Sequence, residues 1–338
     1  MPPNRNEIQH ALSGNPEALI DAHTHVGICL GGYMTTGYPY CQSAADLHGK
    51  LAPLGFDSWV SFAMPTPVVF DLDGYRRCEL TPAGDGSGVP FEFENRRLMV
   101  EVYELLSHLA DRFMCMAVID PARKQPAQVE CLTALDEAYP LFGLKVAGTS
   151  IRSRTVELLG EGQCLLDWAA QRDLPIVMHS AVHPEDPWSR TDDLLRIVEV
   201  RPELRFCIAH AARFDRAYLD RIAALDNCWF DTSAFGIHCD LAVADHLSVA
   251  CPERRFAADY TQPAEVLAAL ADAYPHKMIY GSDSPFESFS IRHRHADGRL
   301  ETYSLLSNVT RETDILRTLP DAVIRRIARD NTLRFLFG

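Results

Sequence analysis

The sequence predicts an α/β protein folded as a closed (β/α)8 TIM barrel. Short apolar runs bounded by turn residues alternate with amphipathic stretches along almost all of the 338 residues. Eight of these runs have the length and composition of strands that are buried on both faces of a parallel sheet. No internal repeat, low-complexity segment or linker breaks the alternation, so we expect a single domain over residues 1–338.

Each expected strand is a short apolar run followed by a polar or turn residue. In chain order the strands cover residues 18–22, 58–63, 113–119, 142–146, 175–178, 205–209, 228–231 and 278–280. Amphipathic stretches, several of which begin with Asp, Thr or Pro, predict helices over residues 96–110, 127–138, 164–171, 191–200, 215–224, 263–273 and 322–337. Two polar stretches, 66–95 after the second strand and 288–313 after the eighth, are expected to be long loop or lid insertions.

Acidic residues outnumber basic ones, because 46 Asp and Glu against 32 Lys and Arg give a net charge of −14. Such a surface repels polyanions, so we expect no nucleic acid and no membrane partner. No apolar run reaches the ~20 residues of a membrane helix, and the first residues lack the order of a signal peptide, so we expect a cytoplasmic location. Ten Cys without a Cys-x-x-Cys pair indicate reduced thiols rather than a thiolate metal site.

Side chains that can bind a metal follow four of the expected strands. His23 and His25 come after the first strand, two residues apart and therefore on one side of the chain. His179 follows the fifth strand, His210 follows the sixth, and Asp283 comes shortly after the eighth. The carboxyl ends of barrel strands meet at one mouth, so these residues predict a site for a divalent metal ion. Nitrogen and oxygen ligands favour Zn²⁺, with Mn²⁺ as an alternative.

The sequence contains a second His-x-His string at residues 293–295. No apolar strand precedes it, and the surrounding residues are polar. We therefore expect it to lie in a solvated loop rather than in the site.

Four local strings resemble the amidohydrolase superfamily of metal-dependent hydrolases. They are Ile-Asp-Ala-His-Thr-His-Val-Gly at 20–27, Phe-Asp-Thr-Ser at 230–233, Tyr-Gly-Ser-Asp-Ser-Pro-Phe at 280–286 and Asp-Asn-Thr-Leu-Arg-Phe-Leu-Phe-Gly at 330–338. They are similar to the amidohydrolase-related (amidohydrolase 2) branch, which also contains non-oxidative decarboxylases. The resemblance implies that His23, His25, His179 and Asp283 are metal ligands, that His210 binds a second metal or the substrate, and that the protein is a homodimer.

Lys145 lies in the string Gly-Leu-Lys-Val-Ala-Gly-Thr at 143–149, which resembles a segment in which the lysine becomes a carbamate that bridges two metals. A carbamate would offer one anionic oxygen to each ion. Alternatively, Lys145 stays an ammonium that pairs with an acid or with a substrate carboxylate. We favour the ammonium, and one ion over two, because the strings at 280–286 and 330–338 resemble the branch in which one ion is usual.

These features predict a metal-dependent hydrolase that cleaves an amide, lactone or ester bond of a small molecule. Metal-activated water would attack the bond, Asp283 would take and return the proton, and His210 or Lys145 would stabilise the oxyanion. The alternative is a metal-dependent non-oxidative decarboxylase of an unsaturated or aromatic carboxylic acid. A non-catalytic binding barrel is disfavoured because none of the expected ligands is missing.

Several residues just beyond the strand ends are candidates for contact with the substrate. Arginine side chains there would suit an anionic molecule, and the candidates are Arg152, Arg154 and Arg213. Further candidates in the same region are His183, His238, Phe286 and Trp188. The alternative for each is a structural role as a solvated charge, a loop residue or a packing aromatic.

Overall fold

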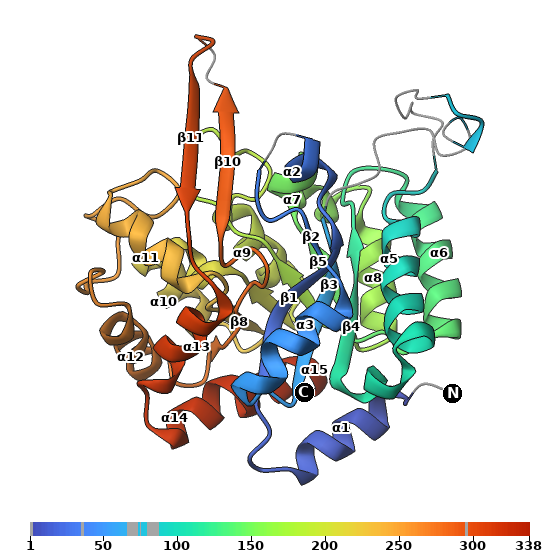
Figure 1. Ribbon diagram of the computed structural model, residues 1–338, viewed down its shortest axis with the longest axis horizontal. Coiled ribbons are helices and arrows are strands. Elements are labelled where there is room, and N and C mark those ends of the chain that lie inside the picture. The colour runs from blue at the N-terminus through green and yellow to red at the C-terminus, as the bar shows by residue number, and fades with distance from the viewer. Residues whose placement is uncertain (1–2, 35–36, 66–73, 75, 80–87, 295–296) are drawn as a thin grey trace.

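The computed structural model describes residues 3–34, 37–65, 74, 76–79, 88–294 and 297–338 (Figure 1). Its main sheet contains nine strands in the order β2-β1-β3-β4-β5-β6-β7-β8-β9. Neighbouring strands from β1 through β9 are parallel, except that the short β2 pairs antiparallel with the end of β1. The strands are β1 (Ile20–Ile28), β2 (Cys41–Gln42), β3 (Ser58–Ala63), β4 (Phe113–Ile119), β5 (Leu144–Val146), β6 (Ile176–Met178), β7 (Phe206–Ile208), β8 (Cys228–Asp231) and β9 (Met278–Ile279).

The sheet closes on itself between β1 and the end of β9. The Ala22 amide donates to the Tyr280 carbonyl at 3.0 Å, and the Asp283 amide donates to the His23 carbonyl at 2.8 Å. We call this contact the β1–β9 seam. It completes a ring of eight parallel strands, so the predicted (β/α)8 barrel is confirmed.

The strands form where the sequence offers short runs of residues that can be buried on both faces. Every residue of β3 and β4 is buried. Large side chains such as Trp59 and Phe113 are fully buried, and their rings pack edge to face with centroids 5.1 Å apart. Burial on both faces is what a parallel sheet covered by helices requires.

Helices surround the barrel (Figure 1). They are α1 (Arg5–Gly14), α2 (Leu30–Met34), α3 (Ala44–Leu51), α5 (Glu92–Val100), α6 (Gln125–Ala138), α7 (Gly148–Ile151), α8 (Gln163–Gln171), α9 (Thr191–Val200), α10 (Arg216–Ala224), α11 (Phe235–Val243), α12 (Pro263–Ala273), α13 (Val309–Arg317), α14 (Asp321–Arg325) and α15 (Asn331–Phe337). The helices predicted over 191–200 and 263–273 match α9 and α12. Within the described residues, no helix has the length and apolar character needed to cross a membrane.

Two predicted helices are wrong in their extent. The helix expected over 96–110 ends as α5 at Val100 and continues as a π-helical turn over Glu101–Leu105 and a 3₁₀ segment over Ser107–Arg112. The helix expected over 322–337 is also interrupted by a π-helical turn, which separates α14 from α15 at Arg326–Asp330. Such turns depend on packing against the barrel and carry no signal in hydrophobic periodicity.

The segment after the last barrel strand contains a β-hairpin where a loop was predicted. β10 (Phe289–Arg294) pairs antiparallel with β11 (Leu300–Leu305), with Phe289 opposite Leu305. His293 belongs to β10, so the loop predicted there is wrong, and His295 lies outside the described residues. The hairpin projects away from the barrel in Figure 1. Most of the other expected insertion, residues 66–95, lies outside the described residues.

Candidate active site

The strand ends at the barrel mouth bring together seven polar side chains that are far apart in the sequence. They are His23 and His25 on β1, Lys145 on β5, His179 after β6, His210 after β7, Asp231 at the end of β8 and Asp283 after β9. All except His179 are buried, with at most 5% of each residue exposed. The eight parallel strands place all these positions at the same end of the barrel.

His23, His25 and Asp283, which we call the metal group, are best placed to hold a metal ion. Their candidate ligand atoms all lie within 4.8 Å of one another. Asp283 Oδ1 is 3.4 Å from His23 Nε2 and 3.3 Å from His25 Nε2. His25 Nδ1 is buried and has no hydrogen-bond partner among the described residues. Two imidazoles and one carboxylate are the donors that Zn²⁺ accepts in catalytic sites, so these residues fit a divalent cation.

The protonation states of the metal group also suit a cation. Burial lowers the pKa of His25 to about 4, so its imidazole is neutral at pH 7. Burial alone would raise the pKa of Asp283, but His23, His25 and Lys145 outweigh it and hold that pKa below its usual value. Asp283 is therefore an ionised carboxylate beside a neutral imidazole.

Asp231 and Lys145 bind the two nitrogens of His23. His23 Nδ1 donates to Asp231 Oδ2 at 2.7 Å, which leaves Nε2 as the acceptor of a hydrogen bond from Lys145 Nζ at 3.0 Å. The ammonium also lies 4.9 Å from the centre of the Phe62 ring. Burial lowers the pKa of Lys145 to about 8, against the opposing effect of Asp231 and Asp283. A cation at His23 Nε2 would take the place of the hydrogen bond from Lys145.

A second cluster, the imidazole cluster, consists of His179, His210, His238 and Arg213. Arg213 Nη2 donates to His179 Nε2 at 3.0 Å, and Arg213 Nη1 donates to His238 Nε2. A guanidinium can only donate, so the proton of each of these neutral imidazoles is on Nδ1. His179 Nδ1 then donates to His210 Nε2 at 2.9 Å, and His210 Nδ1 donates to Ser233. The hydrogen bonds thus run in one direction, from Arg213 to Ser233.

The imidazoles in this cluster are uncharged. Burial, reinforced by the positive charge of Arg213, holds the pKa values of His179 and His210 well below the ordinary value for histidine. The same two causes lower the pKa of His238 to about 3. At pH 7, Arg213 is therefore the cation of the imidazole cluster.

The backbone that carries His210 and Arg213 has an unusual conformation. All five residues of His210–Phe214, which we call the left-handed segment, have positive φ values of 62°, 48°, 46°, 58° and 62°. None is glycine, and left-handed helical conformation costs other residues roughly 1–2 kcal/mol each. The His210 amide donates to Asp231 Oδ1 at 3.0 Å, and the Ala250 amide donates to the Arg213 carbonyl at 2.9 Å. These contacts hold the strained segment at the mouth.

The other predicted contact residues lie in different surroundings. Phe286 packs edge-on against His25, with ring centroids 5.1 Å apart. Arg152 and Arg154 are exposed. His183 accepts a local hydrogen bond from the Glu185 amide. In the described part of the chain, no hydrogen bond or ion pair joins Arg152, Arg154 or His183 to the metal group.

Asp231 and Ser233 belong to the site although neither was among the predicted site residues. Asp231 orients His23, and Ser233 receives the hydrogen bond from His210 and donates to Asp231 Oδ1 at 2.5 Å. The sequence did contain a signal for Asp231, because this residue ends an apolar strand. His179 and His210, which were predicted, follow apolar strands in a similar way.

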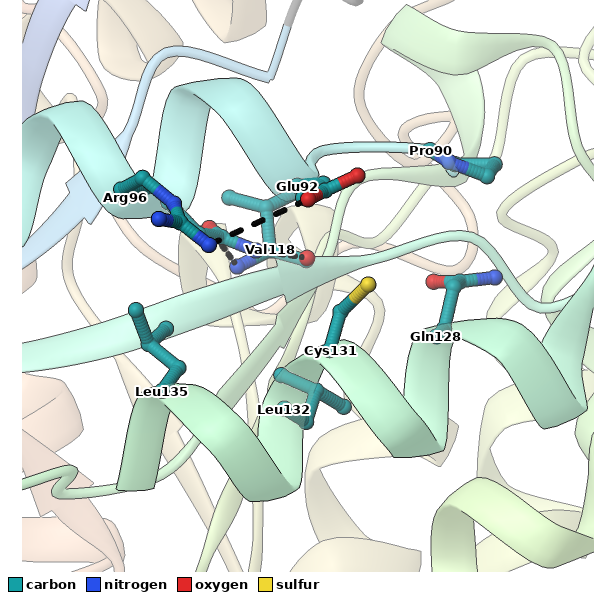
Figure 2. Close-up of a pocket in the computed structure, with 9 residues that line it drawn as sticks. Pro90, Glu92, Arg96, Val118, Gln128, Cys131, Leu132 and Leu135 are labelled. Carbon is teal, nitrogen blue, oxygen red and sulfur yellow. Dashed lines mark hydrogen bonds and ion pairs between the residues drawn. The ribbon is translucent and has the colours of Figure 1, made fainter. Parts of the chain in front are cut away.

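A small cavity elsewhere in the protein is separate from this site. It lies between α5, α6 and β4 and is lined by residues including Glu92, Arg96, Val118 and Cys131 (Figure 2). Its volume of about 20 Å³ is enough for one water molecule. None of the lining residues belongs to the metal group or the imidazole cluster.

A closed barrel with a His-x-His strand and an Asp after the last strand at its mouth defines the amidohydrolase superfamily as the class of this protein. More particularly, the chain belongs to the amidohydrolase family, because the family model described as Amidohydrolase matches residues 20–338. Among curated proteins, none matches the chain significantly.

Three solved structures illustrate how widely the fold is shared. An amidohydrolase 2 from Bifidobacterium longum subsp. infantis is 17% identical, with a TM-score of 0.52 over 94% of this chain and 98% of that chain. An IDCase from Metarhizium anisopliae is 13% identical, with a TM-score of 0.52 over 96% and 98%. A dihydroorotase from Saccharomyces cerevisiae is 14% identical, with a TM-score of 0.51 over 96% and 85%. At these identities the likeness concerns the fold.

Proposed function

We propose that the protein is a metal-dependent hydrolase that cleaves an amide, lactone or ester bond of a small molecule. The observation that carries the proposal is the convergence of His23, His25 and Asp283 within 4.8 Å at the barrel mouth. Family membership supports an enzyme that is a hydrolase or a decarboxylase. The metal group supports the hydrolase because it combines cation ligands with an ionised carboxylate that can accept a proton.

His23, His25 and Asp283 would hold the cation, for which we propose Zn²⁺, with Mn²⁺ as the alternative. When bound, such an ion supplies a Lewis acid and lowers the pKa of water toward neutrality. His179 is the fourth proposed ligand. Both of its ring nitrogens make hydrogen bonds, to His210 and Arg213, so it would have to give up one of these bonds to coordinate the ion.

Asp283 is the proposed proton carrier. Its Oδ1 faces the two imidazoles of the metal group, and its Oδ2 lies 3.8 Å from His210 Nδ1. As an ionised carboxylate it can take a proton from the attacking water and return it to the leaving group.

Lys145 is the better proposed donor to the developing oxyanion. His210 Nε2 accepts from His179 and His210 Nδ1 donates to Ser233, so His210 has no N–H left for substrate in this arrangement. The Lys145 ammonium has three N–H groups and, within the described part of the chain, makes one hydrogen bond, to His23. We propose that Lys145 remains an ammonium, which cannot bridge two cations, and that one ion is bound rather than two.

The proposal is tested by metal analysis and product analysis of the same preparation. We expect one Zn²⁺ per chain, unchanged by bicarbonate, and hydrolysis of a member of a panel of lactones, amides and esters. Asp283→Asn should keep the fold and lower the turnover by roughly 10²–10⁴-fold. The control is His183→Ala, which removes an imidazole outside the metal group.

Three outcomes would contradict parts of the proposal. CO₂ release from an unsaturated or aromatic acid, without hydrolysis of any panel member, would identify a decarboxylase. Full activity in metal-free protein would remove the metal from the reaction. Two ions per chain in the presence of bicarbonate would indicate that Lys145 is a carbamate.

A further inference from the structure

Arg213 is a buried cation to which no carboxylate of the described residues is bound. Only 8% of the residue is exposed. Its Nε donates to the Ser180 carbonyl at 2.7 Å, and its two terminal nitrogens donate to His179 and His238. All three acceptors are neutral. Within the described residues, no carboxylate lies within ion-pair distance of its guanidinium.

The other arginine that is buried in the described part of the chain is neutralised directly. Arg201, with 9% of the residue exposed, forms ion pairs with Asp167 at 2.9 Å and Glu203 at 2.6 Å. The partly buried Arg255 also pairs with a carboxylate, that of Asp245, at 3.0 Å. Burial of a charge is costly unless a partner compensates it, so the isolation of Arg213 calls for an explanation.

The carboxylates with the largest electrostatic effect on Arg213 do not form an ion pair with it. Asp283, Asp186 and Asp231 act on Arg213 through space. Asp283 contacts the metal-group imidazoles, Asp231 accepts from His23, and Asp186 accepts from Thr149 Oγ1 at 2.6 Å. Each of these carboxylates is thus already engaged by another donor.

Arg213 is also held in a costly backbone conformation. It lies within the left-handed segment, with φ of 58°. Two unfavourable features at one residue, strain and a buried charge without a direct ion pair among the described residues, are typical of positions arranged for a ligand. A guanidinium has five N–H groups and three of those of Arg213 are used here, which leaves two for an incoming group.

Arg213 is close enough to the metal group for one small molecule to contact both. It contacts His179 at 3.0 Å, His179 contacts His210 at 2.9 Å, and His210 Nδ1 lies 3.8 Å from Asp283 Oδ2. A group bound to Arg213 would therefore lie beside the imidazole cluster, which reaches the proposed proton carrier through His210.

We propose that Arg213 selects substrates that carry a carboxylate, which it binds through its remaining N–H groups. A planar guanidinium matches the two oxygens of a carboxylate, and neutral imidazoles around it leave the positive charge available. This inference rests on the proposed function, because it concerns a substrate bound in the same site. The exposed Arg152 and Arg154 have no such enclosure.

The test measures binding by calorimetry with small probes and zinc-loaded protein. The probes are benzoate and acetate, each compared with its uncharged isostere, benzamide or acetamide. We expect the wild type to prefer the carboxylates by roughly tenfold to a hundredfold, and Arg213→Gln to abolish this preference without changing the affinity for the amides. Arg213→Lys should retain part of the preference, and the control Arg152→Gln all of it.

Zinc content is measured for every variant. We expect Arg213→Gln to retain its zinc through His23, His25 and Asp283, although the substitution removes the hydrogen bond of Arg213 to His179, the fourth proposed ligand. Loss of zinc would mean that Arg213 supports the metal site instead of binding substrate. Equal affinity of the wild type for acids and amides, or no binding of either carboxylate, would overturn the proposal even if Arg213→Gln fails to fold. A preference that persists in Arg213→Gln would place the carboxylate elsewhere in the site.

These results separate the two proposals. The wild type could prefer carboxylates through Arg213 and yet hydrolyse no member of the panel. That result would contradict the proposed function but support the role of Arg213. Hydrolysis of uncharged substrates with the same kcat/KM as their carboxylated analogues would support the proposed function and contradict the role of Arg213.

Discussion

Asp231 is the residue at which the hydrogen bonds of both clusters meet. Its Oδ2 accepts from His23, and its Oδ1 accepts from the His210 amide and from Ser233. Burial alone would raise the pKa of Asp231, but His23, Lys145 and Ser233 hold it well below its usual value. A single ionised carboxylate therefore fixes the tautomer of His23 and the start of the left-handed segment.

Asp231→Asn is predicted to weaken zinc binding by roughly 10–100-fold, because an amide cannot fix His23 in the same tautomer. A competition titration with a chelator measures this affinity. Asp226→Asn, an exposed substitution just before the same strand, is the control and should leave the affinity unchanged. Equal affinities for the two variants would show that Asp231 does not orient a metal ligand.

The sequence predicts the metal group better than the imidazole cluster for a physical reason. The first strand was predicted to end at residue 22, but β1 continues to Ile28 and contains both His23 and His25. These histidines still meet Asp283, because the geometry of a closed parallel barrel brings its first and last strands together. The direction of the Arg213 side chain depends on five consecutive positive φ values. The segment contains no glycine, so its residue types do not predict this conformation. The hydrogen bonds of His179 to Arg213 and His210 were unpredictable for the same reason.

At the scale of elements, the left-handed segment is the clearest departure from standard backbone. Ala212, with φ of 46°, is fully buried within it. Substitution by glycine would relieve strain of roughly 1–2 kcal/mol, but it would also remove a buried methyl group worth about 0.8 kcal/mol and make the unfolded chain more flexible.

Ala212→Gly is therefore predicted to leave the free energy of unfolding within about 0.5 kcal/mol of the wild type. Ala268→Gly, in the interior of α12, should lower it by about 1 kcal/mol because glycine is a poor helix former. Denaturant unfolding of the two variants makes the comparison. A loss at Ala212 as large as that at Ala268 would argue against stored strain.

The contact between α13 and α11 contains a buried carboxyl group. Both oxygens of Glu312 accept from the Gly236 amide, at 3.1 and 3.2 Å. A Cβ at Gly236 would lie 2.7 Å from Glu312 Oε1, so a larger residue there would force the Glu312 carboxyl group to move. Burial, with a smaller contribution from Glu287, raises the pKa of Glu312 from 4.5 to about 8.

This shift predicts a pH dependence of stability. Because the folded state holds the proton more tightly than the unfolded state, the contribution of Glu312 is complete below pH 4.5 and is lost as the pH rises toward 8. Glu312→Gln should flatten this part of the stability profile, and Glu265→Gln on the exposed side of α12 should not. Denaturant unfolding between pH 5 and pH 9 tests it; parallel profiles for wild type and Glu312→Gln would contradict it.

Elements were predictable where one sequence pattern decides them. α9 and α12 begin with Thr and Pro and keep one apolar face, so their bounds follow from the sequence. The β10–β11 hairpin was missed because its polar composition hides the alternation of Phe289 and Tyr303 with polar neighbours. The interrupted helices near Glu101 and Arg326 depend on packing that the local sequence does not encode.

At the scale of the whole molecule, the metal group spans the β1–β9 seam. His23 and His25 stand on one side of the seam, and Asp283 stands on the other. A cation held by all three would join the first and last strands of the barrel, so its binding energy adds to the stability of the closed fold.

Removal of zinc is therefore predicted to lower the melting temperature by several degrees. Bound zinc stabilises the folded state by ~2.7 kcal/mol when free zinc is 100 times its dissociation constant. Calorimetry with and without a chelator measures the change. The double variant His23→Ala and His25→Ala should melt at the same temperature under both conditions. An equal chelator effect in the double variant would show that zinc stabilises the protein from another site.

The β1–β9 seam can form only late in the synthesis of the chain, because it joins the first and the last strands of the barrel. β1 leaves the ribosome early, yet the strand that covers its edge is made last among the barrel strands, on the order of tens of seconds later. In the interval, the backbone of β1 presents an open edge that other chains could join. β2 protects one end of that edge by pairing with Gly27 and Ile28, and the Gln42 side chain caps the His25 carbonyl at 2.9 Å. Until β9 is made, the open edge of the nascent barrel thus includes the strand that carries His23 and His25, and β2 covers only the end of that edge.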